Sequence, residues 1–205
     1  MGKDMRSLSY LELDALREIG TIGAGHAATA LSQLLNTRVN MMVPRVSAIP
    51  LHEVPCLVSG PETPVVGVFL KVFGDVQGNI LFLLPRESSE SLVDLAIGQP
   101  IGTTRNLNDE FDQSVIKETV NILTSSYLNA LTMMTKLVML PSVPALAQDM
   151  AGALLNTVLT EFGKTGDYAL VIETKFNLPF RELIGHFFLV PHPEALATMM
   201  QTLGV

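Results

Sequence analysis

The sequence predicts an α+β fold in which two internal repeats, each a long helix followed by antiparallel strands, share one sheet. The first observation is the repetition itself: a shift of 100 positions aligns residues 16–44 with residues 116–144 without a gap, and Pro44 meets Pro144. The second is that hairpin-length turns separate the apolar runs after each helix, which favours antiparallel pairing. Because each copy supplies only a few strands, the two copies are expected to share one sheet or core.

The first copy begins with a predicted helix from about Tyr10 to Leu35, and Ser9 and Glu12 stand at capping-box spacing at its start. Four strands are expected next, at residues 38–49, 54–60, 64–74 and 78–85. Gly74 and the aspartate after it belong to the hairpin connection between the last two strands. A short helix over residues 88–98 closes this copy.

The second copy repeats this order, with a predicted helix over residues 109–136. Its strands are expected at residues 137–143, 154–162, 168–176 and 183–191, and its last helix at 193–204. The polar, turn-rich segment 98–109 between the copies is too short to make them independent domains. We therefore expect a single domain over residues 1–205, made of repeats at about 9–98 and 108–204.

Composition excludes some classes of function. The net charge of -7 and the absence of a Lys/Arg-rich stretch argue against nucleic-acid binding, which needs clustered basic residues. No apolar run approaches the roughly 18 residues of a membrane span, and the first residues lack the apolar core of a signal peptide. Cys56 is the only cysteine, which indicates a reducing, cytoplasmic compartment. The four histidines show no metal-ligand spacing, so no metal is expected in this chain.

The mean hydropathy of +0.37 is high for a soluble chain of this size. It predicts either a sheet covered on both faces or a sizeable apolar contact with a partner.

Residues 17–29, REIGTIGAGHAAT, contain three glycines at the spacing G-x-x-G-x-G, which resembles a phosphate-binding loop. Such a loop requires a preceding strand, and a Walker loop also requires Gly-Lys-Ser/Thr, whereas this segment continues a predicted helix. We therefore reject a nucleotide site. Gly20 and Gly23 are expected on the buried helix face, where the close approach of another backbone would compensate their cost of about 0.8–1 kcal/mol each.

Each long helix carries one narrow polar stripe when its residues are placed 100° apart. The second stripe consists of Ser114, Glu118, Asn121 and Ser125, opposite the apolar Ile116, Val120 and Leu123. The first stripe consists of the aligned residues Asp14, Glu18, Thr21 and Gly25. Polar residues on a single exposed helix face are usually only solvated. The repetition of the stripe favours a functional surface.

The second stripe also carries a family resemblance. Ser114, Glu118, Asn121 and Pro144 fit the spacing [DS]-x-x-x-E-x-x-N-x22-P, which resembles the signature of the CheC/CheX/FliY family of chemotaxis proteins. The amino-acid sequence of residues 17–32 is similar to that of CheC proteins, and the resemblance covers essentially the whole chain. It implies two pseudo-twofold-related repeats with the two long helices exposed on one face.

The resemblance implies a phosphatase that accelerates hydrolysis of the aspartyl phosphate of a CheY-type response regulator. Asn121 would orient the attacking water, and Glu118 would pair with the regulator's active-site lysine. Ser114 is expected to be a contact or helix-local residue, and Pro144 to support the strand or loop beneath the helix. No cofactor is expected in this chain, since Mg²⁺ would belong to the phosphorylated regulator.

The first copy departs from the family pattern. Asp14, Glu18 and Pro44 are retained, but Thr21 stands where the family has asparagine, so one working and one degraded site are expected. Three alternatives stay open: a non-catalytic binding module of the flagellar-switch kind, a regulator of the receptor deamidase CheD, and an archaeal or divergent CheC member whose activity is not settled. The resemblance allows CheD as a second partner, but the sequence does not locate the surface it would use.

Overall fold

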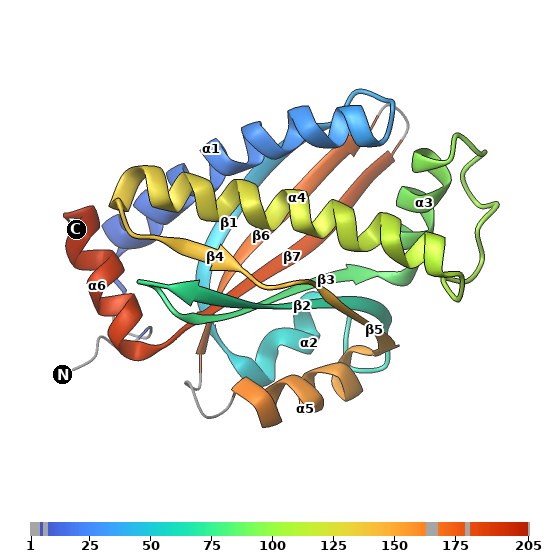
Figure 1. The fold of residues 1–205 in the computed structure, drawn as a ribbon. Coiled ribbons are helices and arrows are strands. Elements are labelled where there is room, and N and C mark those ends of the chain that lie inside the picture. The colour runs from blue at the N-terminus through green and yellow to red at the C-terminus, as the bar shows by residue number, and fades with distance from the viewer. Residues whose placement is uncertain (1–4, 6–7, 163–167, 179–180, 205) are drawn as a thin grey trace.

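The protein folds into one antiparallel sheet with helices on both faces (Figure 1). The computed structural model describes residue 5 and residues 8–162, 168–178 and 181–204. Helices α1 (Tyr10–Leu34) and α4 (Glu110–Thr135) lie side by side across one face. Helices α2 (Val54–Leu57) and α5 (Ala151–Phe162) cover part of the other face. The predicted α+β class and the pair of long helices on one face are thereby confirmed.

The two long helices begin where their capping residues predict. The Ser9 hydroxyl accepts a hydrogen bond from the backbone N–H of Glu12, and the Glu12 carboxylate accepts one from the N–H of Ser9. In the second copy, the Asp109 carboxylate accepts a hydrogen bond of 2.8 Å from the N–H of Phe111. These contacts satisfy backbone donors that the first helical turn leaves unpaired. Both predicted helices are confirmed within about one residue at each end.

The strands of the two copies are interleaved in the sheet, whose order is β1-β6-β7-β3-β2-β4, with β5 also pairing with β2. Their bounds are β1 (Asn40–Pro50), β2 (Pro64–Gly74), β3 (Gly78–Pro85), β4 (Met139–Pro141), β5 (Ala145–Met150), β6 (Tyr168–Leu178) and β7 (Arg181–Pro191). The first strand of each copy pairs with the other copy: β1 with β6, and β4 and β5 with β2. The central β3–β7 pair joins the two halves. Neither copy completes the sheet alone, as expected.

Two of the predicted strands are wrong. Residues 54–60 contain the short helix α2, which follows the 3-10 turn η2 (Leu51–Glu53), and residues 154–162 lie in helix α5. Pro55 stands in the first turn of α2, where its missing N–H has no cost. In α5 the buried residues Ala151, Leu154 and Leu155 follow helical spacing. Short apolar runs without a clear period do not distinguish strand from helix.

A strand was also missed. The predicted strand 137–143 is shorter in the structure, where it forms β4, and β5 follows after Pro144. Five of the six residues of β5 are exposed, so the apolar alternation that marks a half-buried strand is absent. The closing helices α3 (Arg86–Ala96) and α6 (Pro193–Leu203) lie where the sequence predicts them.

Gly23 brings the two long helices into direct contact. A Cβ atom on Gly23 would lie 2.5 Å from Cδ1 and 3.0 Å from Cα of Tyr127, so only glycine fits against the backbone of α4 here. At Gly20 a Cβ atom would meet only side chains, those of Val43 at 3.5 Å and Ile172 at 3.6 Å. The predicted close approach of a backbone is confirmed at Gly23, whereas Gly20 is buried without one.

Tyr127 itself is anchored in the core between the helices and the sheet. Its hydroxyl lies 2.8 Å from Oγ1 of Thr174 on β6, and its ring packs edge-on against Phe187 with centroids 5.0 Å apart. Burial raises the pKa of Tyr127 above its ordinary value, which keeps the phenol protonated. The contact between the helices is therefore fixed to the sheet through one side chain.

The high mean hydropathy is explained by the two apolar layers, because the sheet packs against helices on both faces. Among residue 5 and residues 8–162, 168–178 and 181–204, no helix combines the length and the apolar character that crossing a membrane requires.

Candidate functional site

The second stripe lies on the outer surface of α4. Ser114 and Glu118 are exposed and Asn121 is partly exposed, whereas Val120 and Leu123 on the opposite side of the helix are fully buried. The helix therefore presents a carboxylate and a carboxamide three residues apart, as neighbours on one surface. The placement predicted from the helical period agrees with the structure.

The two functional groups of the second stripe are free to bind a partner. Within the described part of the chain, the side chains of Glu118 and Asn121 form neither a hydrogen bond nor an ion pair. The Ser114 hydroxyl, in contrast, donates a hydrogen bond of 2.7 Å to the carbonyl oxygen of Glu110. Ser114 is thus engaged within its own helix, which supports the helix-local role expected for it.

In the first stripe, two of the polar side chains are engaged within the helix. Asp14 forms an ion pair with Arg17, with Oδ1 2.8 Å from the guanidinium nitrogen Nη2. The Thr21 hydroxyl donates a hydrogen bond of 2.8 Å to the carbonyl oxygen of Arg17. Glu18 is exposed and has no partner among the described residues. The first stripe offers a free carboxylate but no carboxamide.

The two motif prolines interrupt edge strands of the sheet. Pro44 lies in β1 within the irregular register between Met42 and Arg45. Pro144 lies between β4 and β5, which pair with β2 on either side of the break. Proline cannot donate a backbone hydrogen bond to a ladder, so it is tolerated at edges and breaks of this kind. These positions support a structural role for Pro144.

One feature of both stripes was missed from the sequence. Phe111 and Leu11 are exposed by 60% and 69%. Each stands seven residues before the glutamate of its stripe, which places it about 20° from that glutamate around the helix. Leu11 and Phe111 are also related by the shift of 100 positions, so the repeat would have revealed the pair. Each glutamate is accompanied by an exposed apolar side chain on the same helix face.

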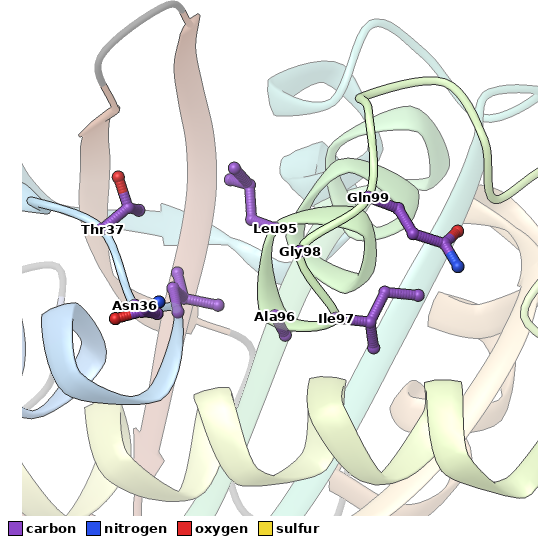
Figure 2. Close-up of a pocket in the computed structure, with 8 residues that line it drawn as sticks. Asn36, Thr37, Leu95, Ala96, Ile97, Gly98 and Gln99 are labelled. Atoms are coloured by element: carbon purple, nitrogen blue, oxygen red, sulfur yellow. The ribbon is translucent and has the colours of Figure 1, made fainter.

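The pocket that the described residues form at the end of α1 lies away from the stripes. A pocket of about 450 Å³ opens between the end of α1 and the end of α3, lined by residues 35–37 and 95–99 (Figure 2). None of these residues belongs to a stripe, and none carries a side chain that titrates near neutral pH. Active sites for small molecules are concave. The open surface of the stripes suits a protein-sized partner instead.

Across the described residues, no three His, Cys, Asp or Glu side chains come together in an arrangement that could bind a metal ion. Cys56 is exposed and unpaired. The groups that the second stripe can offer to a partner are therefore a carboxylate, a neutral amide and an aromatic ring.

Comparison with known proteins places this chain in one family of chemotaxis proteins. The model of the CheC-like family matches residues 11–48, which contain the whole first stripe. The chain is also 36% identical over 196 residues to a protein of Bacillus subtilis (strain 168) named CheY-P phosphatase CheC, and the match covers 94% of each chain. The protein therefore belongs to the CheC-like family.

Solved structures share the fold. FliY of Thermotoga maritima superimposes with a TM-score of 0.79 at 20% identity, over 97% of this chain and 98% of that one. A chain of the CheX-CheY-BeF3-Mg²⁺ complex from Borrelia burgdorferi gives a TM-score of 0.50 at 16% identity, over 83% of this chain and 96% of its own. These two structural similarities show the shared fold alone.

Proposed function

We propose that this protein accelerates hydrolysis of the aspartyl phosphate of a CheY-type response regulator. The observation that carries the proposal is the outward pair of Glu118 and Asn121 on α4, with neither side chain engaged elsewhere in the described structure. The family supports the reaction, since the relative from Bacillus subtilis is a CheY-P phosphatase.

The chemistry asks little of the catalyst besides positioning. An aspartyl phosphate is an acyl phosphate: water attacks phosphorus, the bond to the aspartyl oxygen breaks, and inorganic phosphate and a free carboxylate result. Mg²⁺ on the regulator would balance the charge of the phosphoryl oxygens. What remains to be supplied is a water molecule held in line with the breaking bond.

Asn121 is suited to orient that water. Its amide oxygen can accept a hydrogen bond from the water, and its neutral side chain does not repel the phosphoryl oxygens. Thr21 cannot replace it in the first stripe, because its side chain is shorter and its hydroxyl is bonded to the Arg17 carbonyl oxygen. We therefore assign catalysis to the second stripe alone.

Glu118 is assigned to docking. Its exposed carboxylate stands one turn from Asn121 and can form a charge-assisted hydrogen bond with a lysine of the regulator. Phe111 adds an exposed apolar contact on the same helix face. The receptor deamidase CheD stays a prediction of the family resemblance.

The test compares steady-state phosphate release by Asn121→Ala and Glu118→Ala, each measured over a range of concentrations of phosphorylated regulator with Mg²⁺. Asn121→Ala is expected to lower kcat by at least tenfold with little change in KM, because the amide acts on the water. Glu118→Ala is expected to lower kcat/KM at least tenfold, because the carboxylate acts in binding the regulator on the second stripe.

Asn106→Ala is the matched control, since Asn106 is an exposed asparagine in the segment before α4 and belongs to neither stripe. It is expected to behave as the wild type. Full activity of Asn121→Ala would refute the catalytic assignment and favour a non-catalytic binding module.

A further inference from the structure

The first stripe retains the features assigned to docking and lacks the one assigned to catalysis. Leu11 corresponds to Phe111, and both are exposed. Glu18 corresponds to Glu118, and both are exposed and free of partners among the described residues. Of the exposed apolar side chain, the carboxylate and the carboxamide to which docking and catalysis were assigned, only the carboxamide of Asn121 has no counterpart in the first stripe.

Ile22 extends this correspondence. It is exposed by 37% and follows Glu18 by four residues. Ile122 follows Glu118 at the same spacing and is partly exposed, with part of its side chain packed against the core. Residues four apart are neighbours on a helix surface, so each glutamate lies between an apolar residue two turns before it and an isoleucine one turn after it. Gly25, at the end of the stripe, leaves open space around its Cα atom. A partner shaped to bind the second stripe finds a similar surface on the first.

We propose that the first stripe on α1 is a binding-only site for the same phosphorylated response regulator, and that it competes with the catalytic stripe on α4. The inference rests on the proposed function, because it takes the regulator as the common ligand. A regulator docked at the first stripe meets no amide to orient water, so its phosphoryl group is retained.

The distance between the stripes makes the two docking modes mutually exclusive. Gly23 abuts Tyr127, and α1 and α4 run in opposite directions, as their colours show in Figure 1. Thr21 therefore lies level with residue 129, eight residues from Asn121, or about 12 Å along the helix at 1.5 Å per residue. With helix axes about 8–10 Å apart, the two positions are separated by roughly 15 Å.

A regulator domain is wider than that separation. A compact domain of about 100 residues has a radius of gyration of about 13 Å, and so is roughly 30 Å across. Two such domains centred roughly 15 Å apart on one face would overlap. Each chain therefore holds one regulator at a time, either productively on α4 or unproductively on α1.

Competition of this kind has a defined kinetic signature. Unproductive binding lowers kcat and KM by the same factor and leaves kcat/KM unchanged, because additional substrate fills both modes in the same ratio. With equal affinity for the two stripes, half of the bound regulator is unproductive, so both constants are about half of their values without the first site.

The experiment reverses the charge of the first-stripe glutamate. Glu18→Lys is expected to raise kcat and KM together by about twofold, with kcat/KM unchanged. Glu62→Lys is the matched control: Glu62 is an exposed glutamate in the turn before β2 and belongs to neither stripe. Wild-type constants in Glu18→Lys would overturn the inference while leaving the proposed function intact.

A binding measurement that needs no hydrolysis separates the two proposals. Calorimetric titration with regulator carrying beryllium fluoride and Mg²⁺ is expected to give one regulator per wild-type chain. Glu118→Lys should still bind one regulator through the first stripe, and the double variant with Glu18→Lys should bind none. Two regulators per wild-type chain, or complete loss of binding in Glu118→Lys alone, would contradict competition. If the Asn121→Ala variant showed that Asn121 has no role in catalysis, these binding results would still be expected.

Discussion

Gly23 provides a direct test of how the two stripe-bearing helices are held together. Replacing a helical glycine with alanine normally stabilises a protein by about 0.8–1 kcal/mol through helix propensity. At Gly23 the added methyl group would lie 2.5 Å from Cδ1 and 3.0 Å from Cα of Tyr127. The Tyr127 ring cannot swing away freely, because its hydroxyl is bonded to Thr174 and its ring packs on Phe187.

The structure therefore predicts that Gly23→Ala costs more through overpacking than it gains through propensity. Overpacking of a tight core costs about 1–3 kcal/mol, so the net loss is expected to be up to about 2 kcal/mol. Gly25→Ala is the matched control, since it lies on the same helix with no atom within 4 Å of the added Cβ. It is expected to stabilise by about 0.8–1 kcal/mol.

Urea unfolding followed by circular dichroism measures both values. Opposite signs for the two substitutions support the direct contact of α1 with α4. Equal stabilisation by Gly23→Ala and Gly25→Ala would show that the helices do not touch at Gly23, and would remove the basis for the separation between the stripes.

Three further predictions concern the cap, the first stripe and a buried histidine. Ser9→Ala removes the hydroxyl acceptor at the start of α1 and is expected to lower the free energy of unfolding by about 1 kcal/mol, measured in urea; an unchanged midpoint would contradict the cap. Thr21→Asn supplies the missing amide, so kcat for phosphate release is expected to rise by up to twofold at constant KM; an unchanged kcat would count against its role. Burial lowers the pKa of His186, an effect that Glu173 partly opposes, so the unfolded chain takes up a proton near pH 6.5 while the folded chain resists it. Stability is expected to fall as the pH drops below about 6.5, and His186→Phe should remove that part of the slope; an unaltered slope in urea midpoints between pH 7 and 5 would contradict it.

The helices and the central strands could be predicted because their signals are local. Ser9 and Asp109 cap the long helices through contacts within three residues. The 100-residue repeat showed that two similar units exist, and the hairpin spacing showed that their strands are antiparallel. The repeat could not show that β1 and β4–β5 each pair with strands of the other copy, because pairing across about 100 residues leaves no local pattern.

The errors lie where packing decides between helix and strand. Residues 154–162 are apolar enough for either structure, and the sheet face that they cover imposes the helix α5. β5 was missed because it lies on β2 as an exposed strand, where no apolar alternation is required.

The candidate site followed from helical periodicity more completely than the fold did. A narrow polar stripe on an otherwise apolar helix must face outward, and Glu118 and Asn121 do so. The ion pairs and hydrogen bonds of the remaining polar groups could not be predicted in this way. The sequence does not reveal that Asp14 pairs with Arg17 or that the Thr21 hydroxyl is bonded to the backbone. The exposed pair of Leu11 and Phe111 could have been predicted from the repeat, but both residues stand outside the family motif.

The central claim is that the Asn121 amide, held outward on α4, orients the water that cleaves the phosphoryl group. The most direct measurement is the decay of radiolabelled phosphorylated regulator in excess Asn121→Ala protein, at a concentration where binding has been verified by titration. The account predicts that the bound regulator loses phosphate at its own intrinsic rate, whereas wild-type protein accelerates the loss. Acceleration by the Asn121→Ala protein equal to that of the wild type would contradict it.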